Sequence, residues 1–132
     1  MLIEQAILTQ LNTFAGLIAL VGQRIYYIKA PQAVIEPYVV FFKVSAQRGY
    51  YTTADDGIVS SRFQFSVFST TYSEAKSITA QISLALPRGP TNIGTTPGVD
   101  IGGLYYDNET DLYENETMLF HIACDYLINY YE

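Results

Sequence analysis

Hydrophobic residues recur at helical spacing in two stretches of the chain. In the first stretch they are separated by steps of four and three, and they are Ile3, Ile7, Leu11, Phe14, Ile18 and Val21. Such a stripe marks one face of an amphipathic helix, and Gly22 fits a C-cap in the left-handed conformation. The second stretch opens with Thr71-x-x-Glu74, a capping-box pattern, and Pro87 ends it. Its apolar stripe is Ala75, Ile78, Ile82 and Leu86.

Shorter apolar or alternating stretches predict strands. Before the second helix these are Arg24–Ile28, Tyr38–Val44 and Ser60–Ser69, with a polar hairpin loop or flap over residues 45–58. After it, residues 87–103 are rich in Gly, Pro and Thr and predict a loop with a short strand near Val99. The remaining segments predict a strand over Leu104–Tyr106, an acidic loop over Asp107–Thr117 and a long terminal strand over Met118–Tyr131.

These elements predict an α+β fold. We expect an antiparallel-dominated sheet of about five strands with two helices packed on one face, in the order α-β-β-β-α-β-β. The 132 residues match the length of one domain, so residues 1–132 are predicted to form a single domain.

Composition narrows the class of protein. Hydrophobic residues make up 49% of the chain and charged residues 15%, which argues against intrinsic disorder. No apolar run approaches the 18 residues of a membrane-spanning helix, and the N-terminus lacks the basic region of a signal peptide. The single cysteine, Cys124, cannot form an internal disulfide. We therefore expect a soluble globular protein made in the cytosol.

The charge is unevenly distributed along the chain. The formal net charge is −6, and residues 89–132 contain eight acidic residues and no Lys or Arg. Because affinity for nucleic acid comes largely from cations that neutralise phosphates, we expect no specific binding of DNA.

Candidate catalytic and ligand-binding residues are few. The only histidine, His121, lies three positions before Cys124, so the two side chains of this strand point to opposite faces. Asp107, Glu109 and Asp111 alternate like the start of a calcium loop, but Leu112 and Met118 stand where that loop needs Gly and Glu. The sequence predicts no catalytic residue, no cofactor and no metal site, and hence no enzyme; a loose divalent-ion site in the acidic loop is the alternative.

Several stretches, taken together and in order, resemble a known family. They are RIYYIKAPQ (24–32), PYVVF (37–41), RFQFSVFSTTYSEAKSI (62–78) and DLYENETMLFHIACDYLINY (111–130). This pattern is similar to that of the tail-completion, or tail-terminator, proteins of long-tailed bacteriophages and phage-like gene transfer particles. The chain departs from the family in its longer Gly/Pro/Thr loop and in Phe68, where the family often has Trp.

The resemblance implies a structural protein of the virion, made in the cytoplasm of a bacterial host. Family members form a ring, typically of six subunits, at the head-proximal end of the tail tube. The implied partners are other copies of the chain, the tail-tube protein and the head–tail connector, with DNA passing through the lumen and no membrane involved. Rings of this kind use two different surfaces of each subunit.

Two sets of residues are candidates for these contacts. The acidic run is expected to line the lumen or a subunit contact, although an ordinary solvated loop explains it equally well; it comprises Asp107, Glu109, Asp111, Glu114 and Glu116. The loops 47–57 and 89–103 are expected to dock the tube or the connector, through Arg48, Tyr50, Tyr51, Arg88, Thr95 and Thr96. Two alternatives stay open: another connector or tube component on a similar scaffold, and a small ligand-binding α+β domain.

Overall fold

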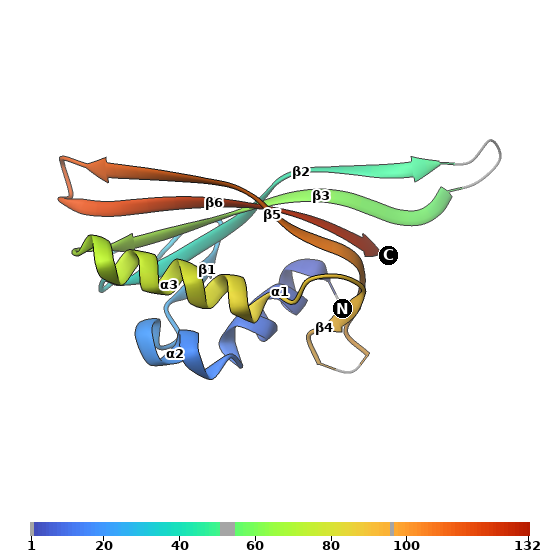
Figure 1. Ribbon diagram of the computed structural model, residues 1–132, viewed down its shortest axis with the longest axis horizontal. Coiled ribbons are helices and arrows are strands. Elements are labelled where there is room, and N and C mark those ends of the chain that lie inside the picture. Colours follow the sequence, from blue (N-terminus) through green and yellow to red (C-terminus); the bar gives the residue numbers. More distant parts are fainter. Residues whose placement is uncertain (1, 51–54, 96) are drawn as a thin grey trace.

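The computed structural model describes residues 2–50, 55–95 and 97–132, apart from the side chains of residues 50, 55 and 56. Within these residues the chain forms three helices and six strands (Figure 1). The helices are α1 (Ile3–Asn12), α2 (Ala15–Val21) and α3 (Tyr72–Ala85). The strands are β1 (Ile25–Tyr27), β2 (Tyr38–Tyr50), β3 (Asp55–Ser69), β4 (Thr91–Ile93), β5 (Val99–Glu114) and β6 (Leu119–Tyr131).

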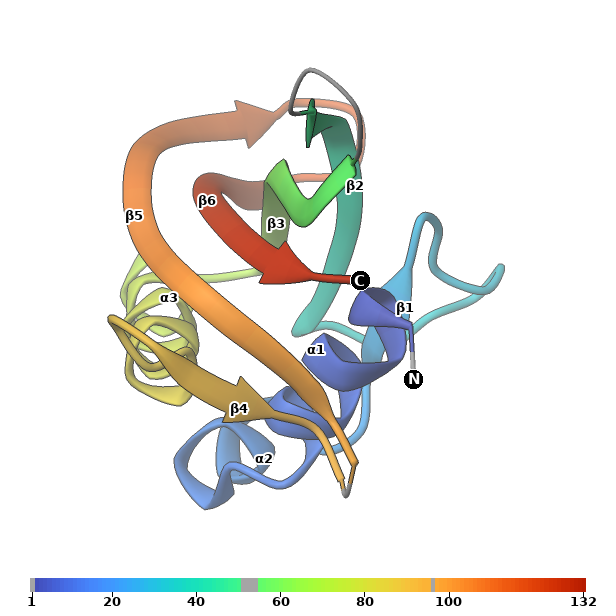
Figure 2. The same cartoon turned by 90° about the vertical axis from the view of Figure 1, so that its right-hand side faces the viewer.

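All six strands belong to one sheet. Their order is β1-β2-β3-β6-β5-β4, and β1 pairs with β2 in parallel while the other neighbours are antiparallel. The helices lie on one face of this curled sheet (Figures 1 and 2). The α+β class and the antiparallel-dominated sheet are confirmed, whereas the expected five strands and two helices become six and three.

The core lies between the sheet and the helices, and it follows the alternation of the central strands. Phe41, Phe65 and Cys124 stand side by side across β2, β3 and β6, and all three are fully buried. Phe65 stacks on Phe41 at 5.4 Å between ring centroids and meets Tyr126 edge-on at 5.2 Å. Burying one such aromatic side chain stabilises the fold by roughly 1.5–3 kcal/mol, so this row fixes the middle of the sheet.

The predicted first helix is interrupted. The Thr13 hydroxyl donates to the Thr9 carbonyl at 2.9 Å, and Phe14 adopts an extended conformation as the N-cap of α2. The apolar stripe therefore continues over two helices, and Gly22 ends the second with a φ of 60°. At α3 the predicted cap is present in a modified form. Thr71 accepts from the Glu74 amide, while the Glu74 carboxylate accepts from the Ser69 hydroxyl.

Two predicted loops contain more strand than expected, and the strand predicted near Val99 is present as the start of β5. Residues 45–50 and 55–58 extend the β2–β3 hairpin, and residues 91–93 form β4 against the start of β5. The turn between β4 and β5 needs glycine at 98, where φ is +66° and a Cβ would come within 2.7 Å of the Ile93 carbonyl oxygen. The polar composition of both segments reflects their exposure at the sheet edges and not a lack of strand structure.

The two long hairpins extend to opposite ends of the molecule (Figure 1). We call residues 107–122 the β5–β6 arm, and residues 45–50 together with 55–61 the β2–β3 arm. In Figure 1, α3 runs beneath the β5–β6 arm, while the β2–β3 arm reaches past the helices toward the side on which both termini lie. None of the helices formed by the described residues has the length and apolar character needed to cross a membrane.

Candidate assembly surfaces

The acidic run does not form the predicted loop. Residues 107–114 are the second half of β5; Asp107 lies in a bulge between Tyr106 and Asn108, and residues 108–114 pair with β6. The regular pairing with the alternating β6 outweighs the weak strand preference of Asp, Glu and Asn. Along the strand, Glu109 and Asp111 lie on the helix-covered face, opposite Cys124 and Ile122.

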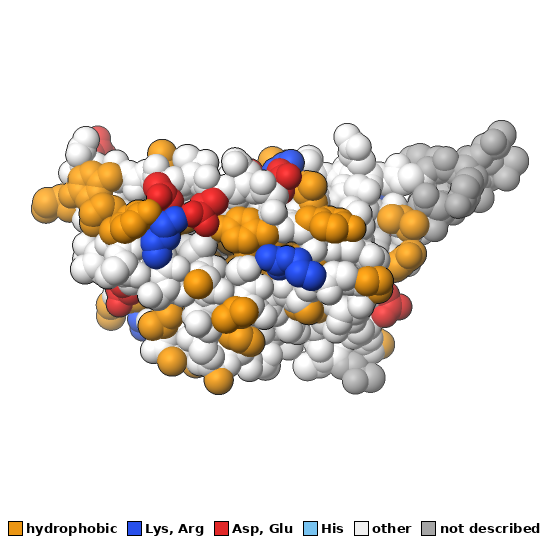
Figure 3. Space-filling view, viewed as in Figure 1, with side chains coloured by type: hydrophobic (Ala, Val, Ile, Leu, Met, Phe, Trp, Pro, Cys, Tyr) orange, Lys and Arg blue, Asp and Glu red, His pale blue; other side chains and the backbone are white. Residues whose placement is uncertain are grey.

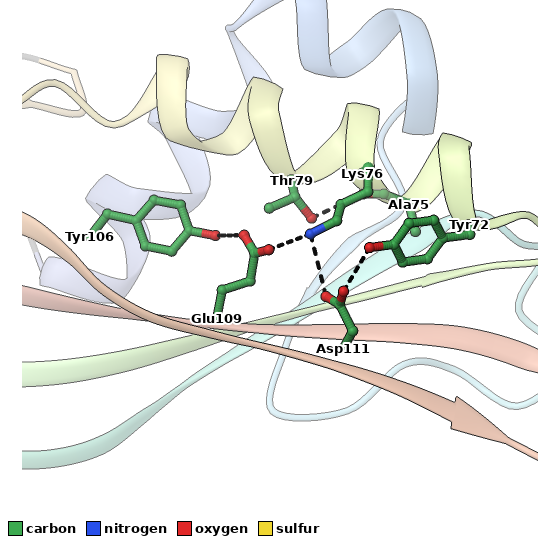
Figure 4. A network of polar contacts seen from close by, with 7 residues as sticks. All are labelled: Tyr72, Ala75, Lys76, Thr79, Tyr106, Glu109 and Asp111. Atoms are coloured by element: carbon green, nitrogen blue, oxygen red, sulfur yellow. Dashed lines mark hydrogen bonds and ion pairs between the residues drawn. The ribbon is translucent and has the colours of Figure 1, made fainter.

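Lys76 of α3 joins these two carboxylates to the helix (Figure 4). Its ammonium group forms an ion pair with Glu109 and lies 3.4 Å from Asp111 Oδ1. The Tyr72 hydroxyl, one helical turn earlier, donates to Asp111 Oδ2 at 2.6 Å, and the Tyr106 hydroxyl donates to Glu109. Two residues of α3 and three of β5 thus form one polar network, which attaches the β5–β6 arm to the helix.

The network favours the charged forms of Lys76, Glu109 and Asp111 and the neutral forms of its two tyrosines. The Lys76 ammonium, together with the Tyr106 hydroxyl, holds the pKa of the Glu109 carboxyl below its ordinary value. The hydrogen bond from Tyr72 lowers the pKa of Asp111, and the bond to Glu109 raises the pKa of Lys76. Burial is the main cause that raises the pKa of the Tyr106 hydroxyl, so this side chain stays a hydrogen-bond donor.

The other acidic candidates lie elsewhere. Asp107 is paired with Arg62 of β3 at 2.9 Å, and Arg62 also reaches Asp125 of β6 at 3.3 Å. Arg62 alternates with the buried Phe63, so this second ion-pair cluster lies on the face that the helices leave uncovered. Glu114 ends β5 and accepts from Thr117 at 3.0 Å, and Glu116 follows in the turn at the end of the arm.

The five acidic residues are therefore divided among three places. Asp107, Glu109 and Asp111 form ion pairs inside the subunit. Their role in the lumen or in a subunit contact stays a prediction, and these ion pairs argue against it because they leave the carboxylates less available to a partner. Sequence analysis missed Tyr72, Lys76 and Tyr106 as partners. A signal was present, because Tyr72 and Lys76 are four apart on a helix and Glu109 and Asp111 are two apart on a strand.

The predicted docking residues are spread over three elements. Arg48 lies on β2 and pairs with Glu132 near the C-terminus, with its Nη2 2.6 Å from Glu132 Oε2. The Arg88 guanidinium donates to the Leu86 carbonyl at 3.0 Å and to the Ser83 hydroxyl at 2.9 Å. Thr95 is exposed in the β4–β5 turn. Tyr51, Thr96 and the side chain of Tyr50 lie outside the described residues.

Parts of both predicted docking loops nevertheless meet. Arg48 and residues 98–100 line the same hollow of about 470 Å³, together with Glu4, Lys43 and Glu132. Lys43 bonds Glu4 of α1 at 3.0 Å within it. The lining of the hollow is mixed, because the ion pairs Lys43–Glu4 and Arg48–Glu132 lie beside apolar residues that include Leu2 and Val99.

His121 and Cys124 point to opposite faces, as predicted. Cys124 is fully buried in the core, where burial raises the pKa of its thiol. His121 stacks on Phe68 at 4.4 Å between ring centroids on the uncovered face, and burial lowers the pKa of its imidazole. Among the described residues no group of three or more His, Cys, Asp or Glu side chains is placed to hold a metal ion.

The fold and these surfaces define a small α+β protein with two long arms, in which Asp107, Glu109 and Asp111 form ion pairs within the subunit. Its sequence assigns it more narrowly. The profile of the family described as "Tail completion protein gp17" matches residues 5–131, and the chain belongs to this family. It is a structural protein of bacteriophage-type tails.

Solved structures agree in fold. A chain in the structure titled "Virion of native gene transfer agent (GTA) particle" superposes with a TM-score of 0.80 at 20% identity, covering 98% of this chain and 95% of that one. No curated protein matches this chain in sequence.

Proposed function

We propose that this protein forms a ring, of six copies, at the head-proximal end of the tail tube, where it stops tube growth and joins the tail to the head connector. Its membership of the tail completion family carries this proposal. The arrangement of the arms is in keeping with it: the hairpins at opposite ends of each subunit offer separate surfaces, which a ring needs for neighbouring copies and for other parts of the tail.

In this proposal the segments around Arg48, Arg88 and Thr95 dock the tube or the connector. Arg48 and the end of the β4–β5 turn line one hollow, so a single partner can contact both predicted loops. DNA passes through the lumen without specific binding, in keeping with the formal net charge of −6 per subunit. In this proposal the described residues of each subunit act by contacting other proteins, and no step requires a cofactor.

The test is electron microscopy of particles assembled without this protein, with re-expressed wild-type protein as the control. We expect tails of uncontrolled length that are not attached to filled heads, and normal tails after re-expression. Tails of normal length that are joined to heads would contradict the proposed function. Tails of normal length without heads would favour the alternative of a connector component that does not end the tube.

A further inference from the structure

Two exposed apolar surfaces lie on opposite edges of the sheet. The tip surface belongs to the β5–β6 arm and the start of α3, and consists of Tyr72, Leu112, Tyr113, Glu114, Glu116 and Met118. The edge surface belongs to β1 and the connection from β1 to β2, and consists of Arg24, Tyr27, Ile28, Lys29 and Ile35. Figure 3 shows hydrophobic side chains gathered at the end of the β5–β6 arm, and Figure 2 shows the β1–β2 connection projecting from the other side of the sheet.

Apolar exposure is high on both surfaces. On the tip surface, Met118 is 67% exposed and Tyr113 is 49% exposed. Tyr72 and Tyr113 both pack on Phe120, with ring centroids at 5.9 Å and 4.9 Å, so the aromatic rings form a supported platform. On the edge surface, Ile28 is 63% and Ile35 is 69% exposed. Clustered exposed side chains of this kind mark sites of protein–protein contact.

Each surface also contains one exposed apolar residue whose backbone adopts an unfavourable, positive φ. Met118 has a φ of +57° and Ile28 a φ of +73°. The left-handed region is uncommon for non-glycine residues, and it is particularly unfavourable for a β-branched residue such as isoleucine. Such strain is kept where the surrounding structure and the function require it.

The charges of the two surfaces are complementary. Within the described part of the chain, Glu114 and Glu116 form no ion pair, and Arg24 and Lys29 have no carboxylate partner. Arg24 instead donates to the Pro37 carbonyl at 2.9 Å. Tip against tip places like charges together, which is costly, whereas tip against edge places carboxylates near cations. Glu36, in the same connection, reduces the positive charge of the edge surface without cancelling it.

The sheet topology places these surfaces where neighbouring subunits can meet. β1 is the first strand of the sheet, and β4 pairs only with residues 99–101 of β5, so the rest of β5 is itself an edge. We propose that the tip surface of one copy binds the edge surface of the next. A repeated contact between two different surfaces generates a ring when its rotation closes, so this inference rests on the proposed ring and names its contact.

Variants that each lose one surface test the contact. The tip variant carries Glu116→Lys with Met118→Lys, and the edge variant carries Lys29→Glu with Ile35→Asp; all four side chains are exposed, so folding should be retained. Leu84→Glu is the matched control, because Leu84 is 66% exposed on α3 and belongs to neither surface. Native mass spectrometry reports the oligomeric state, and circular dichroism confirms that each variant is folded.

We expect rings from the wild type and from Leu84→Glu, and a rise of about tenfold or more in the concentration that each double variant needs to assemble. An equimolar mixture of the two variants should assemble further than either variant alone, since it contains one intact tip, one intact edge and two altered surfaces that again carry opposite charge. Rings formed by either double variant at wild-type concentrations would overturn this contact and leave the ring in place. A wild-type protein that stays monomeric at its highest soluble concentration would contradict both the contact and self-assembly into a ring. Tube termination is judged separately, from tail length.

Discussion

The two arms of the sheet grow from the same central strands but are held in different ways. On the β5–β6 arm, side chains of α3 bind β5 through Lys76 and Tyr72. On the β2–β3 arm, side-chain bonds come from the sheet itself, where Arg48 pairs with Glu132 and the buried Ser61 hydroxyl donates to the Ile128 carbonyl at 2.6 Å. Among the described residues, side chains of a helix therefore bind the β5–β6 arm, whereas the side-chain bonds named for the β2–β3 arm come from β6 and the residue that follows it.

This difference suggests that the two arms make different kinds of contact. A contact that must close a ring needs a fixed angle, which favours the braced β5–β6 arm as the subunit contact. A contact with a different protein, such as the tube or connector proposed above, gains from an arm that can adjust to it, which favours the β2–β3 arm. The following experiments test the comparison, from the largest expected effect to the smallest.

Removing Phe65 should destabilise both arms together. Phe65 is fully buried in the middle of the sheet, between Phe41 of β2 and Cys124 of β6. Phe65→Ala should therefore lower the free energy of unfolding by roughly 3–5 kcal/mol. Chemical denaturation measures this loss, and Val44→Ala, at a side chain 48% exposed, should change it by less than about 0.5 kcal/mol. If hydrogen exchange then accelerated in one arm alone, the idea that both arms depend on the same buried centre of the sheet would be wrong.

Removing the Lys76 ammonium should loosen only the β5–β6 arm. Lys76→Met keeps the aliphatic stem but leaves Glu109 and Asp111 close together without a cation. Because Lys76 and Glu109 are about one-third exposed, we expect a loss of only about 1 kcal/mol. Hydrogen exchange should accelerate in residues 107–113 and stay unchanged in residues 45–50, with Ser77→Ala as the control on the neighbouring position of α3. Equal acceleration in both arms would contradict the bracing role.

Acid should weaken the same attachment. The folded-state pKa of Glu109 is lowered from its ordinary value of about 4.5, so its contribution is complete above that value and is lost as pH falls through the lowered pKa. The pKa of Lys76 is raised above 10.5, so its contribution is lost only at higher pH. Between roughly pH 5 and 10, pairing within the arm should therefore not change. Glu109→Gln should flatten the acid limb of the stability curve, and an unchanged limb would show that other carboxylates dominate it.

The sequence predicted the helices, the central strands and the family resemblance because each depends on local periodicity or on a run of residues. Within the predicted strand Ser60–Ser69, Phe63, Phe65 and Val67 alternate with other residues and all three are buried, and such alternation can be seen without tertiary information. The sequence-based prediction failed at residues 107–114, where acidic composition indicated a loop. The partners of this segment are β6, which follows it across a short turn, and Lys76, which lies 33 residues before Glu109; the composition of residues 107–114 taken alone shows neither.

The smallest effect is expected at Arg48, on the arm that lacks a helix beneath it. Its ion pair with Glu132 is about half exposed, and such pairs contribute little to global stability and are screened by salt. Arg48→Ala should leave the denaturation midpoint within error of the wild type. It should instead accelerate exchange of the Glu132 amide, which bonds the Gly57 carbonyl at 2.9 Å and ties the C-terminus to β3. High salt should reproduce this acceleration in the wild type, with the exposed Thr95→Ala as control. A loss of stability as large as that of Lys76→Met would mean that the two arms are held equally well, and would remove the basis for assigning them different contacts.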